Sequence, residues 1–258
     1  MMRIVCLSAE TVDILVRLGA GGEIVGISTY ATPPAGLEAP VVCGFNSMNL
    51  GAIRKLEPDL ILAYSDVQAD LAAQLIREGF NVLTTNQRSL EEIAATMELL
   101  GRVACRAEAG KKLAEDFRRS LAECRNEEGP RPRVYFEEWN DPLISSIGWV
   151  SELIELAGGE DLFSPWRGHK KASERVVDPE EVLRLQPEII FASWCGKRVE
   201  ARKIAERPGW ADIPAVREGR VFEIDSSKIL QPGLAILEGL QEMRRHIAAW
   251  RAERMVAA

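Results

Sequence analysis

The sequence LEPDLILAYSD at residues 56–66 recurs as LQPEIIFASWC at residues 185–195. In both copies a short helical pattern leads to a proline, and the apolar run that follows ends beside an aromatic residue, Tyr64 or Trp194. Continuous apolar runs of this kind are typical of parallel strands that are buried on both faces of a sheet. The repeat therefore predicts one parallel α/β unit in each half of the chain.

Two weaker echoes support this interpretation, because they occur in the same order at similar spacings. RIV at residues 3–5 matches RVY at 133–135, and GGE at 21–23 matches GGE at 158–160. The alternative is that two unrelated α/β stretches share a common local pattern. Apolar runs alternate with amphipathic ones in both halves, which predicts βαβ units. The expected strands cover residues 3–8, 24–28, 59–63, 80–85, 133–138, 188–193 and 220–225.

A helical segment separates the two halves. Apolar residues between Leu90 and Leu121 recur at intervals of three and four, and Ser89 with Glu92 forms a capping box. We therefore expect one or two long helices that connect the halves as a stiff spacer. The predicted organisation is an α/β protein with two Rossmann-like lobes and parallel sheets: an N-terminal lobe at 1–88, a connecting helix at 89–130 and a C-terminal lobe at 131–258.

The composition excludes several classes of protein. The chain has 258 residues, with 32 Lys and Arg against 39 Asp and Glu, and a net charge of −7. Apolar residues make up 47% of the chain, which is enough for a folded core, and the acidic balance argues against nucleic acid as a partner. No apolar run approaches the roughly 18 residues that a membrane span requires. Five cysteines without a CxxC pair argue against a disulfide framework or a zinc ribbon.

The N-terminal sequence MMRIVCLS indicates a strand and lacks the basic and apolar regions of a secretory signal. We therefore expect a cytoplasmic protein. A leader removed from this chain would instead indicate a periplasmic or surface-anchored protein.

Aromatic residues gather where the expected strands end. Of the 6 Trp, 3 Tyr and 7 Phe, five lie shortly after the end of an expected strand or of the short apolar run at 41–42: Tyr30, Phe45, Tyr64, Trp139 and Trp194. Ligands of parallel sheets bind beyond the carboxyl ends of the strands, and aromatic side chains suit a large, flat, partly apolar ligand. We therefore expect a ligand-binding cleft between the lobes, although these aromatics could instead seal the lobe interface. Further candidates for ligand contact are Asn46, Met48, Cys195 and Gln231.

His169 is the candidate metal ligand. It lies in a glycine-containing loop, RGHKK at 167–171, which can bring an imidazole to a ligand, whereas His246 lies in an arginine-rich helical stretch and is expected at the surface. Imidazole commonly binds transition metals, including cobalt or iron in a macrocycle; a hydrogen-bonding role is the alternative. No P-loop, GxSxG or HExxH motif is present, so we do not expect an enzyme.

Residues 47–93, from SMNLGAIRKLEPDLILAYSD to NQRSLEEI, resemble the vitamin B12-binding group of substrate-binding proteins of bacterial ABC importers. The second half is similar to a signal-less subgroup of cobalamin-binding proteins, in FEEWNDPL at 136–143, GHKK at 168–171 and DPEEVLRLQPEIIFASWCG at 178–196. The resemblance covers nearly the whole chain. It implies the two-lobed, helix-linked fold of class III periplasmic binding proteins, and the binding of cobalamin or a related corrinoid between the lobes without chemical conversion.

The resemblance also assigns residues to the ligand. Tyr30, Phe45 and Tyr64 occupy positions at which the first lobe of the family faces the corrin. The same fold carries haem and ferric siderophores, so a carrier of haem or of a siderophore is the alternative. A second alternative is an enzyme that modifies a tetrapyrrole, with Glu138 or His169 as acid or base, and a third is an interaction module. The positions typical of the signal-less subgroup are Trp139, Trp149, His169, Trp194 and Cys195.

Docking on an ABC permease is the partner interaction that the resemblance implies, through one acidic residue at the tip of each lobe. Asp70 matches the first of these positions, and Lys228 stands at the second. Because acidic residues at both tips are what pair with two basic permease sites, the reversed charge at Lys228 makes such docking doubtful.

Overall fold

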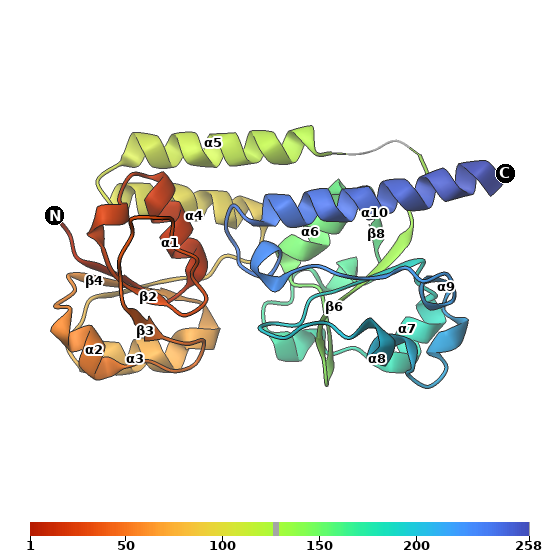
Figure 1. Ribbon diagram of the computed structural model, residues 1–258, viewed down its shortest axis with the longest axis horizontal. Helices are drawn as coiled ribbons and strands as arrows, with labels where there is room; N and C mark the ends of the chain where they lie inside the picture. The colour runs from red at the N-terminus through yellow and green to blue at the C-terminus, as the bar shows by residue number, and fades with distance from the viewer. Residues whose placement is uncertain (126–128, 258) are drawn as a thin grey trace. The chain divides into compact units, whose positions relative to one another are not determined.

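Both copies of the repeat form a central strand of a sheet. The structure is a computed structural model that describes residues 1–125 and 129–257. The chain divides into two compact units, Met1–Arg118 and Arg119–Ala258, and each unit has its own sheet (Figure 1). The predicted α/β architecture is therefore confirmed.

The first unit contains a five-stranded sheet in which all neighbouring strands are parallel. The order is β3-β2-β1-β4-β5, so β2 and β3 lie on one side of β1, and β4 and β5 lie on the other. Such a switch point is where open α/β sheets bind ligands. The strands are β1 (Ile4–Cys6), β2 (Ile24–Ser28), β3 (Val41–Cys43), β4 (Leu60–Tyr64) and β5 (Val82–Thr85).

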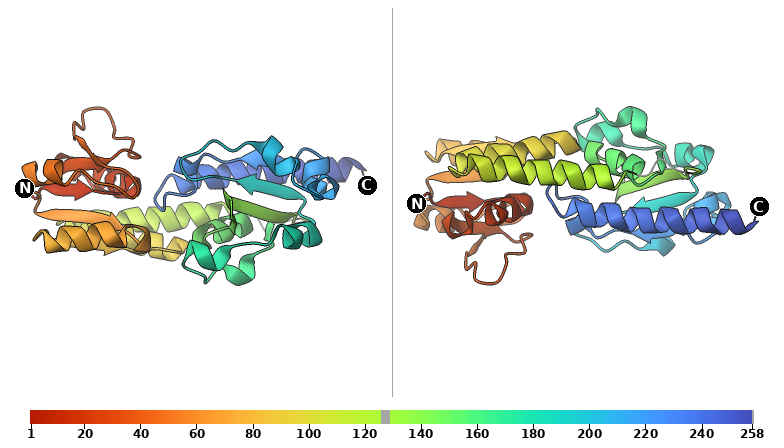
Figure 2. Two further views of the ribbon diagram at one scale, coloured as in Figure 1. Left: turned by 90° about the horizontal axis from the view of Figure 1, so that it is seen from below. Right: turned by 90° about the horizontal axis from the view of Figure 1, so that it is seen from above.

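Helices cover both faces of this sheet, with α1 and α4 on one face and α2 and α3 on the other (Figures 1 and 2). Ile53 of α2 and Leu75 of α3 pack with Ile61 of β4 in one core. The loop 29–40 between β2 and β3 stands away from the sheet (Figure 2). The helices are α1 (Ala9–Arg17), α2 (Leu50–Lys55), α3 (Ala69–Arg77), α4 (Leu90–Val103) and α5 (Ala107–Glu123), with 3-10 turns η1 (Gly21–Glu23) and η2 (Asp66–Gln68).

One buried carboxyl group of the first unit lacks a full set of partners. Glu10 lies in the first turn of α1, just after β1, and is buried. Within the part of the chain that the structure describes, its Oε1 has no hydrogen-bond partner. Burial raises the pKa of Glu10 to about 7, although a hydrogen bond with the Ser8 side chain acts in the opposite direction. The folded protein therefore favours the protonated form of this carboxyl group.

The helical segment after residue 88 is a pair of antiparallel helices, α4 and α5. Gly101 and Gly110 meet where the two helices cross: a Cβ added to Gly101 would lie 2.6 Å from the Cα of Gly110. Further along, Arg118 donates to Glu91, with 2.9 Å between Nε and Oε2, and to Glu98 at 3.0 Å. These contacts hold the two helices together along their length. The boundaries at 88 and 130 stay predictions, and residues 126–128 of this segment lie outside the described residues.

The second unit contains a five-stranded mixed sheet. Its order is β10-β9-β6-β7, and β8 pairs with the beginning of β6. All pairs are parallel except β6 with β7, which form an antiparallel hairpin that differs from the expected purely parallel sheet. The two residues between them are too few for the crossover that parallel strands need. The strands are β6 (Arg133–Asn140), β7 (Leu143–Ser145), β8 (Glu160–Asp161), β9 (Ile189–Ala192) and β10 (Val221–Glu223).

The two copies of the repeat adopt the same backbone path. Strand β6 pairs with β9 as β1 pairs with β4, beginning with Val134 opposite Ile189. The residue before each proline adopts a left-handed conformation, with φ of 45° at Glu57 and 49° at Gln186. At these two residues the chain leaves a helix, α2 or α7 (Pro179–Leu185), and turns toward the strand. The structure thus supports the interpretation of the two halves as copies of one topology.

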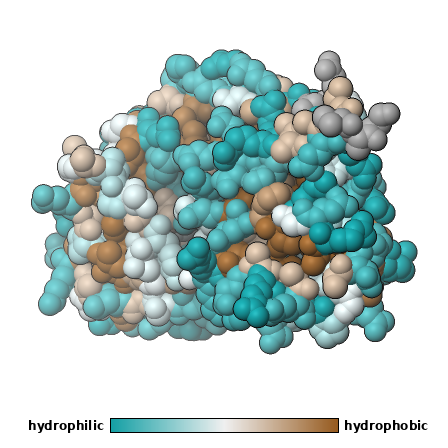
Figure 3. Space-filling model, turned by 45° about the vertical axis from the view of Figure 1, so that its right-hand side comes forward, coloured by the Kyte–Doolittle hydropathy of each residue, from teal (hydrophilic) through white to brown (hydrophobic). Residues whose placement is uncertain are grey.

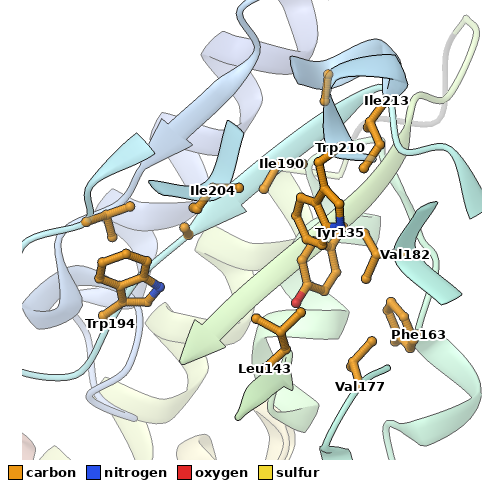
Figure 4. Close-up of a cluster of buried hydrophobic side chains, with 13 residues drawn as sticks. Tyr135, Leu143, Phe163, Val177, Val182, Ile190, Trp194, Ile204, Trp210 and Ile213 are labelled. Atoms are coloured by element: carbon orange, nitrogen blue, oxygen red, sulfur yellow. The ribbon is translucent and has the colours of Figure 1, made fainter. Parts of the chain in front are cut away.

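The core of the second unit packs around aromatic side chains (Figure 4). The ring of Tyr135 makes edge-to-face contacts with Phe163 and Trp210, with ring centroids 5.6 and 6.1 Å apart. Figure 4 shows Trp194 at one end of this cluster and Phe163 at the other. The other helices of this unit are α6 (Gly148–Leu156), α8 (Ala201–Ala205), α9 (Pro214–Arg217) and α10 (Ile236–Ala257), with 3-10 turns η3 (Ser164–Trp166), η4 (Ala172–Arg175), η5 (Trp210–Asp212) and η6 (Ser226–Lys228).

Helix α10 packs against the sheet through His246. Its imidazole stacks on Phe222, with ring centroids 3.8 Å apart, and lies 5.9 Å from the ring centroid of Phe191. Burial lowers the pKa of His246. This histidine is therefore half-buried and part of the packing, rather than at the surface as expected.

The face of the molecule drawn in Figure 3 is largely polar. On the face in Figure 3, hydrophilic side chains predominate and apolar ones gather in a few patches between them. Across residues 1–125 and 129–257, no helix combines the length and the apolar character that crossing a membrane would require.

Candidate functional site

Two aromatic side chains meet at the carboxyl edge of the first sheet. Tyr30 follows β2 and Phe45 follows β3, and because these strands are parallel neighbours, both residues reach the same edge. Their rings lie edge to face with centroids 6.2 Å apart. The two residues are 44% and 40% exposed, so they present an aromatic patch to solvent and not a single exposed ring. The structure therefore brings together two of the aromatic residues that the sequence singled out.

Buried Gln68 joins this aromatic pair to the end of β4. Its side-chain oxygen accepts from the backbone N–H of Tyr64 at 2.9 Å. Its amide nitrogen donates to the carbonyl oxygens of Phe45 at 3.3 Å and Leu7 at 3.0 Å. One side chain thus holds the segments after β1, β3 and β4 in register. Sequence reasoning missed Gln68, because a glutamine in a helical turn carries no pattern that distinguishes it from a surface residue.

Asn46 and Met48 lie in the tight turn after β3. The turn is closed by the Gly44 N–H, which donates to the Ser47 carbonyl at 2.8 Å, and by a bridge between Cys43 and Met48. Asn46 is exposed at the turn, whereas Met48 packs against the hydrophobic core of the unit. Of these two candidates, Asn46 is the one that presents its side chain to solvent.

Tyr64 at the end of β4 is held by Arg88. The Arg88 guanidinium donates from Nη1 to the Tyr64 hydroxyl and from Nη2 to Asp66 Oδ1, both at 2.6 Å. Its carbon Cζ lies 5.3 Å from the centroid of the Tyr64 ring. Arg88 is buried, whereas the Asp66 side chain is 49% exposed. Arg88 follows β5 and lies 24 residues from Tyr64 in sequence, so no local motif pointed to it.

Trp194 at the carboxyl end of β9 is buried in the second unit by a charged network. Its indole N–H donates to Glu137 Oε1 at 3.0 Å. Arg207 donates to both oxygens of the same carboxylate, with 2.9 Å between Nη2 and Oε1, and stacks over Trp210 at 4.6 Å. The Tyr135 hydroxyl also contacts Glu137, at 3.4 Å. Trp194 is therefore buried and presents no exposed surface at the end of β9.

Glu138 belongs to a second, separate ion pair. Arg175 donates to both of its oxygens, at 2.6 and 3.1 Å, and also to the backbone carbonyl of Ser145. Arg175 is 1% exposed, and the Glu138 side chain is 18% exposed. Neighbouring residues on a strand point to opposite faces, which explains why Glu137 and Glu138 have no partner in common.

Trp139 and Cys195 lie near the exposed end of β6. The Trp139 indole N–H donates to the Asp141 carbonyl at 2.9 Å, and the Lys197 ammonium group lies 4.5 Å from the ring centroid. Burial raises the pKa of the Cys195 thiol, and the Glu138 carboxylate raises it further. Because the thiolate is the metal-binding form, these surroundings disfavour Cys195 as a metal ligand.

His169 is exposed and has one ring nitrogen engaged. Its Nδ1 lies 2.9 Å from the Glu174 carbonyl, which can only accept, so Nδ1 carries the proton. The ring lies nearly parallel to Trp166, with centroids 6.1 Å apart. This tautomer leaves Nε2 with its lone pair, as a metal-ligating imidazole requires. In the described ranges no three His, Cys, Asp or Glu side chains gather to hold a metal ion.

Two further candidates are engaged within the second unit. Trp149 of α6 is 2% exposed, and its indole N–H donates to the Ile229 carbonyl at 2.8 Å. Gln231 is half-buried, and its backbone carbonyl accepts from the N–H of Gly233 just before α10. The expected ligand contacts of Trp149 and Gln231 stay predictions, but Trp149 has no free face in this unit.

Comparison of the sequence with known proteins gives matches along nearly its whole length. The family model described as "Periplasmic binding protein" matches residues 4–228. The vitamin B12-binding protein of Vibrio cholerae is 28% identical over 247 residues, which cover 93% of this chain and 87% of that protein. An uncharacterized ABC transporter substrate-binding lipoprotein of Bacillus subtilis is 24% identical over 257 residues, 95% of this chain and 79% of that protein.

Solved structures match across both units. The crystal structure of the periplasmic vitamin B12-binding protein of Vibrio cholerae gives a TM-score of 0.74 at 26% identity, covering 96% of this chain and 97% of that one. The periplasmic haem-binding protein of Roseiflexus sp. RS-1 in apo form gives a TM-score of 0.80 at 22% identity, covering 95% and 97%. The latter identity is low enough that the likeness bears on the fold alone. The two-lobed fold expected from the sequence is confirmed.

Proposed function

Because the chain belongs to the periplasmic binding protein family, we propose that it binds cobalamin or a related corrinoid without chemical conversion. The Vibrio cholerae relative, named for vitamin B12 binding, supports this ligand class. The observation that carries the proposal is the exposed aromatic pair Tyr30–Phe45 at the carboxyl edge of the first sheet. Trp139 occupies the corresponding edge of the second sheet. A corrin ring is large, flat and partly apolar, so aromatic side chains stabilise it by burial and stacking.

In this proposal His169 is the axial ligand of cobalt. Its Nε2 is the nitrogen left for the metal, and the hydrogen bond from Nδ1 to the Glu174 carbonyl orients the ring, as such a bond does for metal-ligating histidines in general. Exposure of His169 in a loop gives a bulky macrocycle access to that nitrogen.

Haem is the second candidate ligand. The ability of imidazole to bind iron as well as cobalt supports it, because His169 could then ligate either metal. The exposed cations Lys197 and Arg198 also suit the anionic propionates of haem.

Titration with cyanocobalamin, aquocobalamin and haemin tests the proposal. Tyr30→Ala and Phe45→Ala should each weaken cyanocobalamin binding by about tenfold, because each removes an aromatic contact. Ile76→Ala is the control, since Ile76 is a large apolar residue of the same unit, on α3, and is 60% exposed. Unchanged affinity in both aromatic variants would refute the assigned site, and no saturable binding of any corrinoid would refute the function.

The role of His169 has a separate spectroscopic test. Binding of aquocobalamin through an imidazole shifts its absorption bands, and His169→Ala should abolish this shift. His246→Phe is the control, because it changes the other histidine of the chain and should leave the shift intact. A band shift that survives in His169→Ala would exclude His169 as the cobalt ligand.

The proposed cellular role is to hold or deliver the corrinoid in a reducing compartment. All five cysteines are free, as is usual for proteins of the cytoplasm. Asp70 is exposed in the first turn of α3, but Lys228 pairs with Glu238 at 3.6 Å and offers no acidic group. The proposal therefore does not include docking on a permease through two acidic tips.

A further inference from the structure

Lys197 covers the aromatic ring at the carboxyl edge of the second sheet. Its ammonium group lies 4.5 Å from the centroid of the Trp139 ring, near the end of β6. Trp139 is half-buried and packs against the hydrophobic core of this unit, so the exposed Lys197 covers the part of the ring that the core leaves open. Lys197 therefore occupies the place at which a flat ligand would stack on Trp139.

The turn that carries Lys197 is anchored at both ends. The Lys197 N–H donates to the carbonyl of buried Trp194 at 3.0 Å, and these two residues form an isolated bridge. Two residues later, Val199 is buried, and its N–H donates to Glu223 Oε1 at 2.9 Å. The backbone at Lys197 is thus fixed, and movement of the charge requires only rotation of the flexible lysine side chain.

In the described part of the chain, the charge of Lys197 has no carboxylate partner. Neither Lys197 nor the neighbouring Arg198, both exposed, forms an ion pair within residues 1–125 and 129–257, and Asp141 at the β6–β7 turn pairs with neither. Three carboxylates of the adjoining segments are engaged by other cations, in the pairs Glu137–Arg207, Glu138–Arg175 and Glu200–Lys203. The turn therefore presents two cations beside an aromatic ring.

We propose that a ligand which stacks on Trp139 displaces Lys197, and that the released ammonium group, together with Arg198, binds an anionic oxygen of the same ligand. This inference rests on the proposed function. In cobalamin the anionic group is the phosphodiester of the nucleotide loop, because the other side chains of the corrin end in neutral amides. A cation–π contact at an exposed site is weaker than a hydrogen-bonded ion pair, so this exchange favours a ligand that carries both a flat ring and an anion.

Two ligands that differ by one phosphate group test the inference. Cobinamide and cobinamide phosphate are titrated as their dicyano forms, in which cyanide fills both axial positions of cobalt and His169 does not contribute. We expect the unaltered chain to bind cobinamide phosphate about tenfold more tightly than cobinamide, because a charge-assisted hydrogen bond is gained. Lys197→Ala should reduce this ratio to about threefold or less, whereas Lys197→Arg, which keeps the charge, should retain it.

Displacement of the lysine has a signature of its own. Lys197→Ala uncovers the Trp139 ring, so this variant should bind cobinamide about two- to fivefold more tightly than the unaltered chain does. Lys203→Ala is the matched control, because it removes an exposed ammonium group of the same unit that binds Glu200 at 2.6 Å. This control should change neither the ratio nor the affinity for cobinamide. Both lysines are exposed, so neither change removes a buried contact.

The outcomes are distinct. Equal affinity of the unaltered chain for cobinamide and cobinamide phosphate would overturn the inference and leave the proposed function standing. A ratio that survives in Lys197→Ala, weaker binding of cobinamide by that variant, or binding of cyanocobalamin without binding of either cobinamide would also overturn it. Absence of cyanocobalamin binding would refute the proposed function itself.

Haem propionates are the other source of an anionic oxygen on a flat ligand. Haemin and its dimethyl ester, in which both propionates are neutral, form a second pair for titration. A preference for haemin that Lys197→Ala removes, without a preference for phosphate in the corrinoid pair, would assign the anion to haem and overturn the phosphodiester assignment.

Discussion

Replacing Glu10 by glutamine should remove a pH dependence of stability that this buried carboxyl group imposes on the folded chain. Burial raises the pKa of Glu10 from 4.5 to about 7. The protonated form is favoured in the folded state, so the stabilisation is complete below the ordinary pKa and is lost as pH rises through the raised one. At about 1.36 kcal/mol for each pKa unit, the free energy of unfolding should fall by about 2.5 kcal/mol between pH 5 and pH 8 through this group alone.

Urea unfolding at several pH values between 5 and 8 measures this effect. The quantity to compare is the difference in free energy of unfolding between the unaltered chain and Glu10→Gln. Circular dichroism is the required signal, because Glu10 lies in the first unit and all six tryptophans lie in the second. Glutamine does not titrate, so subtraction removes the contributions of every other group. Glu108→Gln replaces an exposed carboxyl group of the same unit. The difference in free energy of unfolding between this variant and the unaltered chain should not vary with pH.

Burial of Glu10 fixes the sign of this pH dependence. The unaltered chain should lose stability relative to Glu10→Gln as the pH rises. A difference that stays constant to within about 0.5 kcal/mol would show that the carboxyl group is ordinary in the folded state. A difference of opposite sign would show that the ionised form of Glu10 is the stabilised one.

Three further predictions follow from the packing. Gly101→Val should destabilise the protein by at least about 1–3 kcal/mol in thermal unfolding, because its side chain would overlap Gly110, whereas Gly22→Ala, at a site with open space, should cost much less. Glu137→Gln should lower the free energy of unfolding, followed by tryptophan fluorescence, by about 3 kcal/mol, since it leaves Arg207 with an uncompensated charge; a loss below 1 kcal/mol would mean that solvent reaches that charge. His246→Phe should remove a loss of stability that appears as pH falls below about 6.5, because the folded state favours the neutral imidazole; identical pH profiles of variant and unaltered chain would contradict this.

Most strands could be predicted from the sequence, because a strand that is buried on both faces has a continuous run of apolar residues. The run at 24–28 coincides with β2, and the run at 188–193 contains β9. The hairpin of β6 and β7 could not be predicted in this way, since its second strand has three residues and shows no distinct period. The two helices of the connecting segment could be predicted, but not their antiparallel pairing, which depends on two glycines nine residues apart coming into contact.

The candidate site was predicted in its aromatic part and missed in its polar part. Tyr30 and Phe45 stand out because large apolar groups after strands are uncommon in polar loops. Arg88 and Arg175 carry no such signal, since their partners are 22 and 37 residues away and only the fold brings them together. Nor could the sequence distinguish half-buried Trp139 from fully buried Trp194, because the direction of a side chain at a strand end depends on what packs beneath it.

The left-handed residues before the two prolines restrict how this chain can drift in evolution. A β-branched residue is strained at such a φ, whereas glycine or asparagine adopts it readily. A saturation library at Glu57 and at Gln186 should therefore return the same short set of tolerated residues, dominated by glycine and asparagine and free of valine and isoleucine. The two positions lie 129 residues apart and should tolerate the same substitutions. The turn from helix to strand can therefore be kept in both copies even where the sequences around it have diverged.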